Sequence, residues 1–250
     1  MSDAHFTLLL RLADDHLILG HRLSEWCGHA PMLEEDLSLP NIALDLIGQS
    51  RALYTHAGEI EGKGRDEDAL AYLRHERGYA NALICERPNG DFGHTMLRQL
   101  YFSLFMEQFW QGCAQSSDKT LSDIANKAIK ETTYHIRHSA EWVIRLGDGT
   151  QESHERMKEA LDDLAPYLGE LFESDETTKA WAKAGLAPDP SDLCAAWEQA
   201  LAPILDEATL GPVSVTTAIT GGRAGKHTED MGHLLSDLQY IQRTHPGQTW

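Results

Sequence analysis

The chain has 250 residues, of which 42% are hydrophobic and 24% are charged, as expected for a globular protein with a sizeable core. Its 21 Lys and Arg residues against 39 Asp and Glu residues give a formal net charge of −18. That balance argues against binding to nucleic acid or to an anionic membrane surface, because both require cationic side chains. It favours a solvated acidic surface, which is also able to recruit a basic partner.

The cysteines and the apolar segments bear on the cellular compartment. The four cysteines form no Cys-x-x-Cys pair, so neither a zinc ribbon nor a thioredoxin-type site is indicated. No basic leader precedes the apolar run 8–10, and no uncharged run approaches the roughly 18–20 residues that span a bilayer. We therefore expect a cytoplasmic protein with free thiols.

Helical patterns dominate the chain, and no run of alternating β-branched residues predicts a strand. Pro40 suits the first turn of a helix, because its missing N–H is not needed there. Asp66 and its acidic neighbours suit the start of another helix, where negative charge complements the helix dipole. In chain order, the predicted helices span residues 4–27, 40–57, 66–87, 92–114, 119–146, 153–172, 176–184, 191–209 and 228–243.

The connections between these helices predict the fold class. The second to fifth predicted helices are joined by short turns, which favour antiparallel neighbours in a bundle. The chain contains no internal repeat and no low-complexity stretch, and residues 211–225 are predicted to form a Gly- and Thr-containing loop. We therefore predict an all-α fold, with residues 1–250 forming a single helical-bundle domain that carries additional C-terminal helices.

Two segments come close to a dimetal motif. Bundles that hold two iron or manganese ions use Glu-x-x-His twice, together with single acids from two other helices. Here Glu76 is followed at that spacing by Tyr79, and Glu131 is followed by Tyr134. A neutral phenol is a far poorer ligand for a divalent ion than imidazole. The sequence therefore predicts a bundle without metal chemistry, and it favours support or partnership over catalysis.

Single acids on two other predicted helices complete this pattern. Asp45 lies in the apolar run 42–47, and Glu107 lies among aromatic residues. The resulting vestigial site consists of Asp45, Glu76, Tyr79, Glu107, Glu131 and Tyr134. The alternative for each acid is a solvated position on an amphipathic helix. Buried acids would need a cation or protonation to compensate them. The candidate cations are Lys127, one turn from Glu131, together with Arg77 and Arg51.

Other clusters indicate chemistry more weakly. His135 and His138 share a helix face at a spacing that allows metal binding, although hydrogen-bonded helical histidines are commoner. The segment 221–226 resembles a phosphate cradle, but it lacks the Gly-Lys-Ser/Thr sequence and a preceding strand, which favours a flexible loop whose basic residues are able to contact an anionic partner. No Gly-x-Ser-x-Gly elbow indicates a serine nucleophile.

Several segments closely resemble the C subunits of bacterial phenylacetyl-CoA epoxidases, also called phenylacetate-CoA oxygenases. The matching segments are residues 23–31, 41–49, 127–131 with Tyr134 and His135, 196–198, and the tail 239–243 with 246–248 and Trp250. The resemblance covers essentially the whole chain, and its first and last motifs are the most specific.

The resemblance implies a ferritin-like helical bundle and a role in aerobic phenylacetate breakdown. In that family a different polypeptide, the A subunit, carries the di-iron centre and epoxidises the ring of phenylacetyl-CoA with O₂. A reductase supplies electrons to it, and a small B subunit joins the assembly. The C subunit is a relative of A without a working metal site, so no cofactor is expected in this chain.

Three hypotheses follow from these observations. The leading one is a non-catalytic structural subunit that pairs with A and stabilises it. The second is an active dimetal oxidase with the acid-and-tyrosine ligand set named above. The third is an acyl-CoA-binding module, whose CoA phosphates would lie near Arg223 and Lys226.

Overall fold

A computed structural model describes residues 2–216 and 218–248 of the protein. Trp250, the last residue of the tail motif, lies outside these residues. Within the described ranges every regular element is a helix, so the all-α prediction is confirmed. None of the described helices combines the length and apolar composition that a bilayer span requires. The chain divides into two compact units, so the prediction of a single domain over 1–250 stays a prediction.

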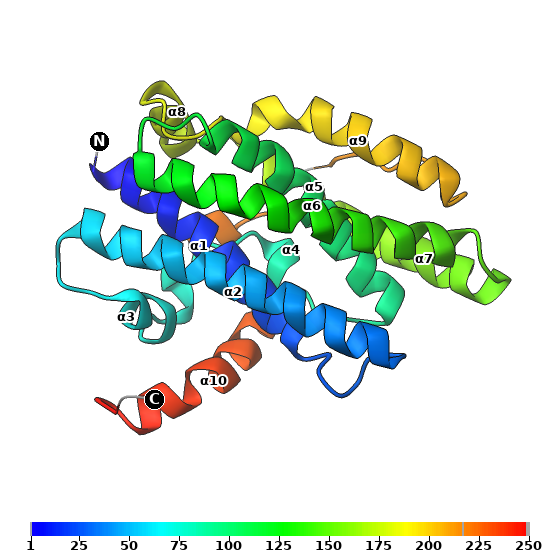
Figure 1. The fold of residues 1–250 in the computed structure, drawn as a ribbon, viewed down its shortest axis with the longest axis horizontal. Helices are drawn as coiled ribbons and strands as arrows, with labels where there is room; N and C mark the ends of the chain where they lie inside the picture. The colour runs from blue at the N-terminus through cyan, green and yellow to red at the C-terminus, as the bar shows by residue number, and fades with distance from the viewer. Residues whose placement is uncertain (1, 217, 249–250) are drawn as a thin grey trace. The chain divides into compact units, whose positions relative to one another are not determined.

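The first unit comprises residues 1–88 and 221–250. Its helices are α1 (Ser2–Ser24), α2 (Leu33–Glu61), α3 (Glu67–Tyr72), the short 3-10 helix η1 (Glu76–Gly78), α4 (Leu83–Glu86), the 3-10 helix η4 (Gly222–Ala224) and α10 (Glu229–Thr244). Helices α1 and α2 lie side by side and antiparallel (Figure 1). They approach closely at Gly20, where a Cβ atom would lie 3.2 Å from Ile47 Cγ1 and 3.3 Å from Ala43 O.

Helix α2 begins earlier than predicted. It starts at Leu33 rather than at Pro40, so the placement of Pro40 in a first turn is wrong. Acidic residues in the true first turn favour this start by complementing the helix dipole. Pro40 lies inside the helix and removes one backbone hydrogen bond, but the ladder continues on either side. Asp36 anchors the preceding turn, because its Oδ1 accepts the Gly28 N–H at 2.6 Å.

The continuous helix predicted over 66–87 is wrong. Helix α3 ends at Tyr72, and an irregular segment with the single turn η1 precedes α4. The Arg74 guanidinium takes over part of the backbone hydrogen bonding, because it donates to Leu70 O and Gly78 O. Side-chain donors from Arg74 thus replace the regular ladder, an effect that helical periodicity does not reveal.

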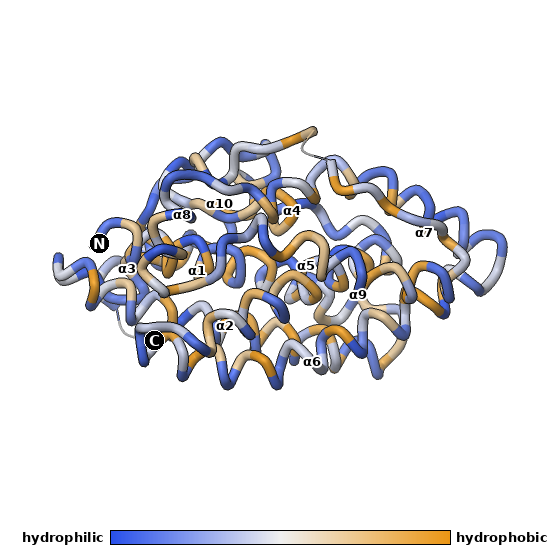
Figure 2. The backbone as a smooth tube through the Cα atoms, turned by 90° about the horizontal axis from the view of Figure 1, so that it is seen from above, coloured by the Kyte–Doolittle hydropathy of each residue, from blue (hydrophilic) through white to orange (hydrophobic). Residues whose placement is uncertain are grey.

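The second unit comprises residues 89–220. Its elements are α5 (Phe92–Cys113), α6 (Lys119–Gly147), α7 (Gln151–Leu164), η2 (Ala165–Phe172), α8 (Glu176–Lys183), η3 (Pro190–Leu193) and α9 (Cys194–Glu207). Helix α5 is buried over most of its length, whereas α6 alternates between hydrophilic and hydrophobic residues at helical spacing (Figure 2). Helices α6, α7 and α9 pack against α5, which forms the centre of this unit.

Side-chain caps explain why the predicted helix starts in this unit are nearly right. Asp91 and Asp118 accept backbone N–H groups at the starts of α5 and α6. Thr150 and Asp175 form capping boxes at α7 and α8. The helix predicted over 153–172 divides into α7 and η2, because Pro166 lacks the N–H that a continued α-helix needs.

Candidate functional site

The first unit contains a buried network of charged side chains, and it starts at Asp14 on α1. Arg74 donates to both Asp14 oxygens, and the Tyr54 hydroxyl donates to Oδ1 at 2.5 Å. The backbone N–H of Ala80 donates to Oδ2 at 2.7 Å. Burial alone would lower the pKa of the Arg74 guanidinium, but the carboxylate of Asp14 outweighs burial and the pKa is raised. Asp14 therefore holds the irregular segment after α3 against the long helix pair.

Asp15, the next residue, forms a second pair with the C-terminal part of the unit. Its Oδ1 accepts Arg223 Nη1 at 2.9 Å and the Ala82 N–H at 2.7 Å. Its Oδ2 lies 2.9 Å from Arg223 Nη2. Burial raises the pKa of Asp15 even though Arg223 opposes this change. The pair joins α1 to the segment at η4, which is 208 residues away in the sequence.

Glu86 at the end of α4 is the third buried acid. Its Oε1 accepts the Thr228 N–H at 2.6 Å, and its Oε2 accepts Asn81 Nδ2 at 2.9 Å and His227 Nδ1 at 2.7 Å. The other ring nitrogen of His227 donates to Tyr79 O at 3.0 Å. Two acceptors for two ring nitrogens require an imidazolium. Burial would lower the pKa of His227, but the bond and charge of Glu86 raise it above its ordinary value.

These pairs form a closed arrangement. All six carboxylate oxygens of Asp14, Asp15 and Glu86 contact protein donors. The three negative charges are matched by the positive charges of Arg74, Arg223 and His227. A divalent ion would have to displace a guanidinium or imidazolium to reach these oxygens. The network therefore fixes chain segments in place and does not offer a set of open ligands.

The predicted site residues of the first unit do not share one helix face. Glu76 is exposed in η1, and Tyr79 is buried in extended backbone. The Tyr79 hydroxyl donates to Ala71 O and accepts from Gln239 Nε2 at 2.8 Å. Burial raises its pKa to about 12. The helical Glu-x-x-Tyr spacing is therefore absent here, while Asp45 is half-buried on α2.

The predicted site residues of the second unit do lie on α-helices. Glu107 is half-buried on α5, and burial raises its pKa. Glu131 on α6 is half-buried and pairs with the exposed Lys127 at 3.3 Å, whereas a cation in the place of a lost metal stays a prediction. Tyr134 is exposed, and its ring lies 5.9 Å from that of His138. Membership of all six residues in one vestigial site stays a prediction.

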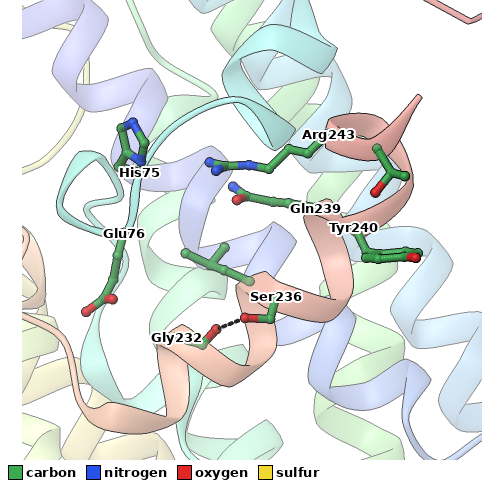
Figure 3. Close-up of a pocket in the computed structure, with 9 residues that line it drawn as sticks. His75, Glu76, Gly232, Ser236, Gln239, Tyr240 and Arg243 are labelled. Carbon is green, nitrogen blue, oxygen red and sulfur yellow. Dashed lines mark hydrogen bonds between the residues drawn. The ribbon is translucent and has the colours of Figure 1, made fainter. Parts of the chain in front are cut away.

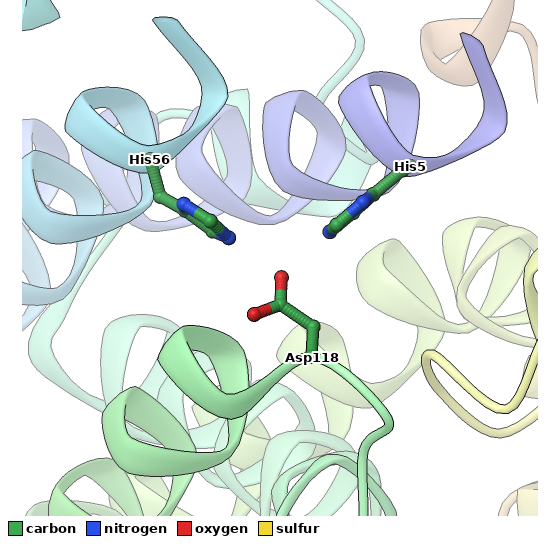
Figure 4. Close-up of side chains that lie close together, drawn as sticks. All are labelled: His5, His56 and Asp118. Carbon is green, nitrogen blue, oxygen red and sulfur yellow. The ribbon is translucent and has the colours of Figure 1, made fainter. Parts of the chain in front are cut away.

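Each unit by itself is poor in clustered metal ligands. Among the described residues of either unit, no three His, Cys, Asp or Glu side chains bring ligand atoms within 4.8 Å of one another. In the first unit the rings of His5 and His56 meet edge to face at 5.7 Å (Figure 4). Asp118, drawn in the same view, belongs to the second unit, where it caps α6.

The Gly-rich segment 221–226 is packed rather than flexible, so its interpretation as a flexible loop is wrong. A Cβ atom at Gly222 would lie 2.2 Å from Asn81 O, and one at Gly225 would lie 2.4 Å from Arg77 O. Arg223 contacts Asp15 and Ala80 O, which removes support for its predicted role near CoA phosphates.

A groove of about 440 Å³ separates α10 from the segment around η1 (Figure 3). Gln239 and Arg243 extend from α10 toward this segment, and both donate to Arg74 O at 2.9 Å. Glu76 lies on the groove wall. The polar side chains of the groove therefore attach α10 to the buried network.

The sequence holds a signal for this network outside the dimetal motif. Asp14 and Asp15 interrupt the apolar run of α1, where adjacent acids need buried partners. The partners Arg74, Arg223 and His227 carry no local signal, because each lies far along the chain from the acid that it pairs with.

A sequence model of the family described as phenylacetic acid catabolic protein matches residues 1–250. The chain belongs to this family. Its fold is therefore the ferritin-like helical bundle of phenylacetic acid catabolic proteins. The chain is also 45% identical over 241 residues to the C subunit of 1,2-phenylacetyl-CoA epoxidase from Escherichia coli K12, covering 96% of this chain and 97% of that protein. The resemblance to epoxidase C subunits is confirmed.

Proposed function

We propose that this chain is a non-catalytic structural subunit of a multicomponent monooxygenase that epoxidises the ring of phenylacetyl-CoA. Its partner is the catalytic A subunit, which carries the di-iron centre. A small B subunit also joins the assembly, and the reductase is an indirect partner that acts on A. The chain serves phenylacetate catabolism by pairing with A and stabilising it.

The closed network carries this proposal. Asp14, Asp15 and Glu86 are buried acids in a ferritin-like chain, yet guanidinium and imidazolium groups neutralise them. An oxidising dimetal centre needs carboxylates and imidazoles that converge on open coordination positions. Glu76, an exposed acid of η1, and Tyr79, whose hydroxyl is already hydrogen-bonded, do not meet that need.

The name of the Escherichia coli relative supports the second part of the proposal. That protein is named as the C subunit of the epoxidase, which implies an assembly with other subunits. The identity extends over nearly the full length of both proteins, which supports a like role for this chain.

Metal analysis of the chain purified alone and with the A subunit, combined with an epoxidase assay, tests the proposal. We expect iron and epoxide formation only when A is present, and a lower soluble yield of A when this chain is omitted. About two irons per isolated chain would instead establish the dimetal oxidase. Binding of phenylacetyl-CoA to the isolated chain would establish the acyl-CoA module. An A subunit that is equally soluble and active alone would contradict the supporting role.

A further inference from the structure

Helix α2 carries an apolar face that its own unit leaves uncovered. Leu33, Leu37 and Leu44 are 71%, 60% and 64% exposed. At 100° per residue they fall within about 40° of one another around the helix axis. We call Leu33, Leu37, Leu44 and Gly48 the leucine face.

The leucine face is concentrated rather than scattered. Of the nine large hydrophobic residues that are exposed within the described ranges, Met32 and the three leucines fall inside a thirteen-residue stretch. The opposite side of α2 packs on α1 through Leu39, Ile42 and other buried residues. A helix that is apolar on both sides is expected to bury both.

The shape of the face suits another helix. Leu33 to Gly48 spans about 22 Å along the helix, a length of four turns. A Cβ atom built at Gly48 has no neighbour within 4 Å, so the backbone is open to close approach there. Leucine side chains flanking such an open position are the elements of ridge-into-groove packing between helices.

Charge limits which chain can occupy the face. Residues 23–50 contain no Lys or Arg. Acidic residues flank the leucine face: Glu34 and Asp45 lie along one edge, and Asp36 lies along the other. A second copy of the chain would bring the same acidic edges and a net charge of −18, so electrostatic repulsion would oppose its approach. The charge therefore favours a different chain.

We propose that the leucine face is the docking surface for an apolar helix of a different chain, whose edges carry Lys or Arg. This inference rests on the proposed function and identifies that chain as the catalytic subunit. The three leucines insert between its apolar side chains, and Glu34 and Asp45 contact its basic residues at the edge of the interface.

A competition experiment tests this surface with full-length chains. The tagged Leu37→Glu/Leu44→Glu variant and untagged wild type are co-expressed with the catalytic subunit and compete for it. The ratio of variant to wild type that is bound to the catalytic subunit gives their relative affinity. We expect the double variant to bind at least about tenfold more weakly than wild type, because two anchors become charged. Leu73→Glu, at a leucine of the same unit that is 57% exposed and off the face, should compete equally with wild type.

The outcomes separate the surface from the function. If wild type captures the catalytic subunit and the double variant competes equally, the leucine face is not the docking surface, and the supporting role stands. If wild type captures no catalytic subunit, both fail. If the isolated chain dimerises and the double variant abolishes the dimer, the face binds a second copy, which overturns the proposal. Circular dichroism checks folding, and the milder Leu37→Gln variant replaces the double variant if that one misfolds.

Discussion

At the residue scale, buried cations replace solvent as the partners of three acids in the first unit. Arg74 shows how much depends on one side chain, because it binds Asp14, Leu70 O and Gly78 O and lies 4.1 Å from the Tyr79 ring centroid. Removing either member of such a pair leaves a buried charge without compensation.

We predict that Arg74→Met lowers the free energy of unfolding by about 3–5 kcal/mol, because Asp14 is left charged and buried. The matched control is Arg51→Met, which breaks the exposed pair between Arg51 and Glu67. That pair should contribute less than about 1 kcal/mol, because solvent screens it. Urea denaturation of both variants measures the difference, and equal losses would show that burial does not govern these pairs.

His227 gives the network a dependence on pH. Its native pKa is raised above 6.5, so the native state retains a proton that the unfolded chain releases. The contribution of protonated His227 to the stability of the folded state is complete below pH 6.5. It is lost as pH rises from there through the native pKa of His227. We therefore expect wild type to lose more stability between about pH 6 and about pH 8.5 than His227→Gln does, as measured by urea denaturation at both values.

His94 in the second unit provides a control of opposite sign. Burial lowers its pKa, although Asp163 opposes this change. The native state therefore loses stability as pH falls below 6.5, because the unfolded chain binds a proton that native His94 does not. Replacing His94 should make the protein less sensitive to acid in that range. A His227→Gln variant with the same pH dependence as wild type would show that its imidazolium does not stabilise the fold.

At the element scale, close contacts between helices decide whether a helical glycine can be replaced. Gly147 ends α6 directly against Ala208, and a Cβ atom there would lie 2.4 Å from Ala208 O. Gly48 on α2 has open space at the same position. Helix propensity alone treats the two substitutions alike.

We predict opposite effects of Gly→Ala at these two helix positions. Gly48→Ala should stabilise the isolated chain by about 0.5–1 kcal/mol, because alanine restricts the unfolded chain and favours the helix. Gly147→Ala should destabilise it by about 1–3 kcal/mol, because α6 must move away from Ala208. Thermal unfolding compares both variants with wild type. A stabilised Gly147→Ala variant would mean that this contact relaxes at little cost.

The difference between local signals and contacts between distant residues explains which elements the sequence predicts and which it does not. Periodicity and caps such as Asp118 and Thr150 are local, so they place α5, α6 and α7 within a few residues. The interruption after α3 is not local, because it depends on Arg74 reaching Asp14 across 60 residues. The closed network depends on three such distant pairs, so the resemblance of whole segments identified the family, while the Glu-x-x-Tyr spacing did not reveal the buried charges.

At the scale of the whole molecule, the net charge of −18 acts together with the leucine face. A negative chain attracts a basic partner from a distance, and the apolar face then determines how strongly the complex holds. Electrostatic attraction between exposed charges is screened by salt, whereas the burial of leucines is not.

We therefore predict that the association rate with the catalytic subunit falls at least about tenfold between about 50 and about 500 mM NaCl, while the dissociation rate changes less. Glu34→Lys at the edge of the leucine face should lower the rate at the lower salt concentration more than Glu207→Lys, an equal change of charge at an exposed position of the second unit. Stopped-flow fluorescence measures both rates. Equal effects of the two variants would mean that net charge alone attracts the partner, and a rate independent of salt would exclude electrostatic steering altogether.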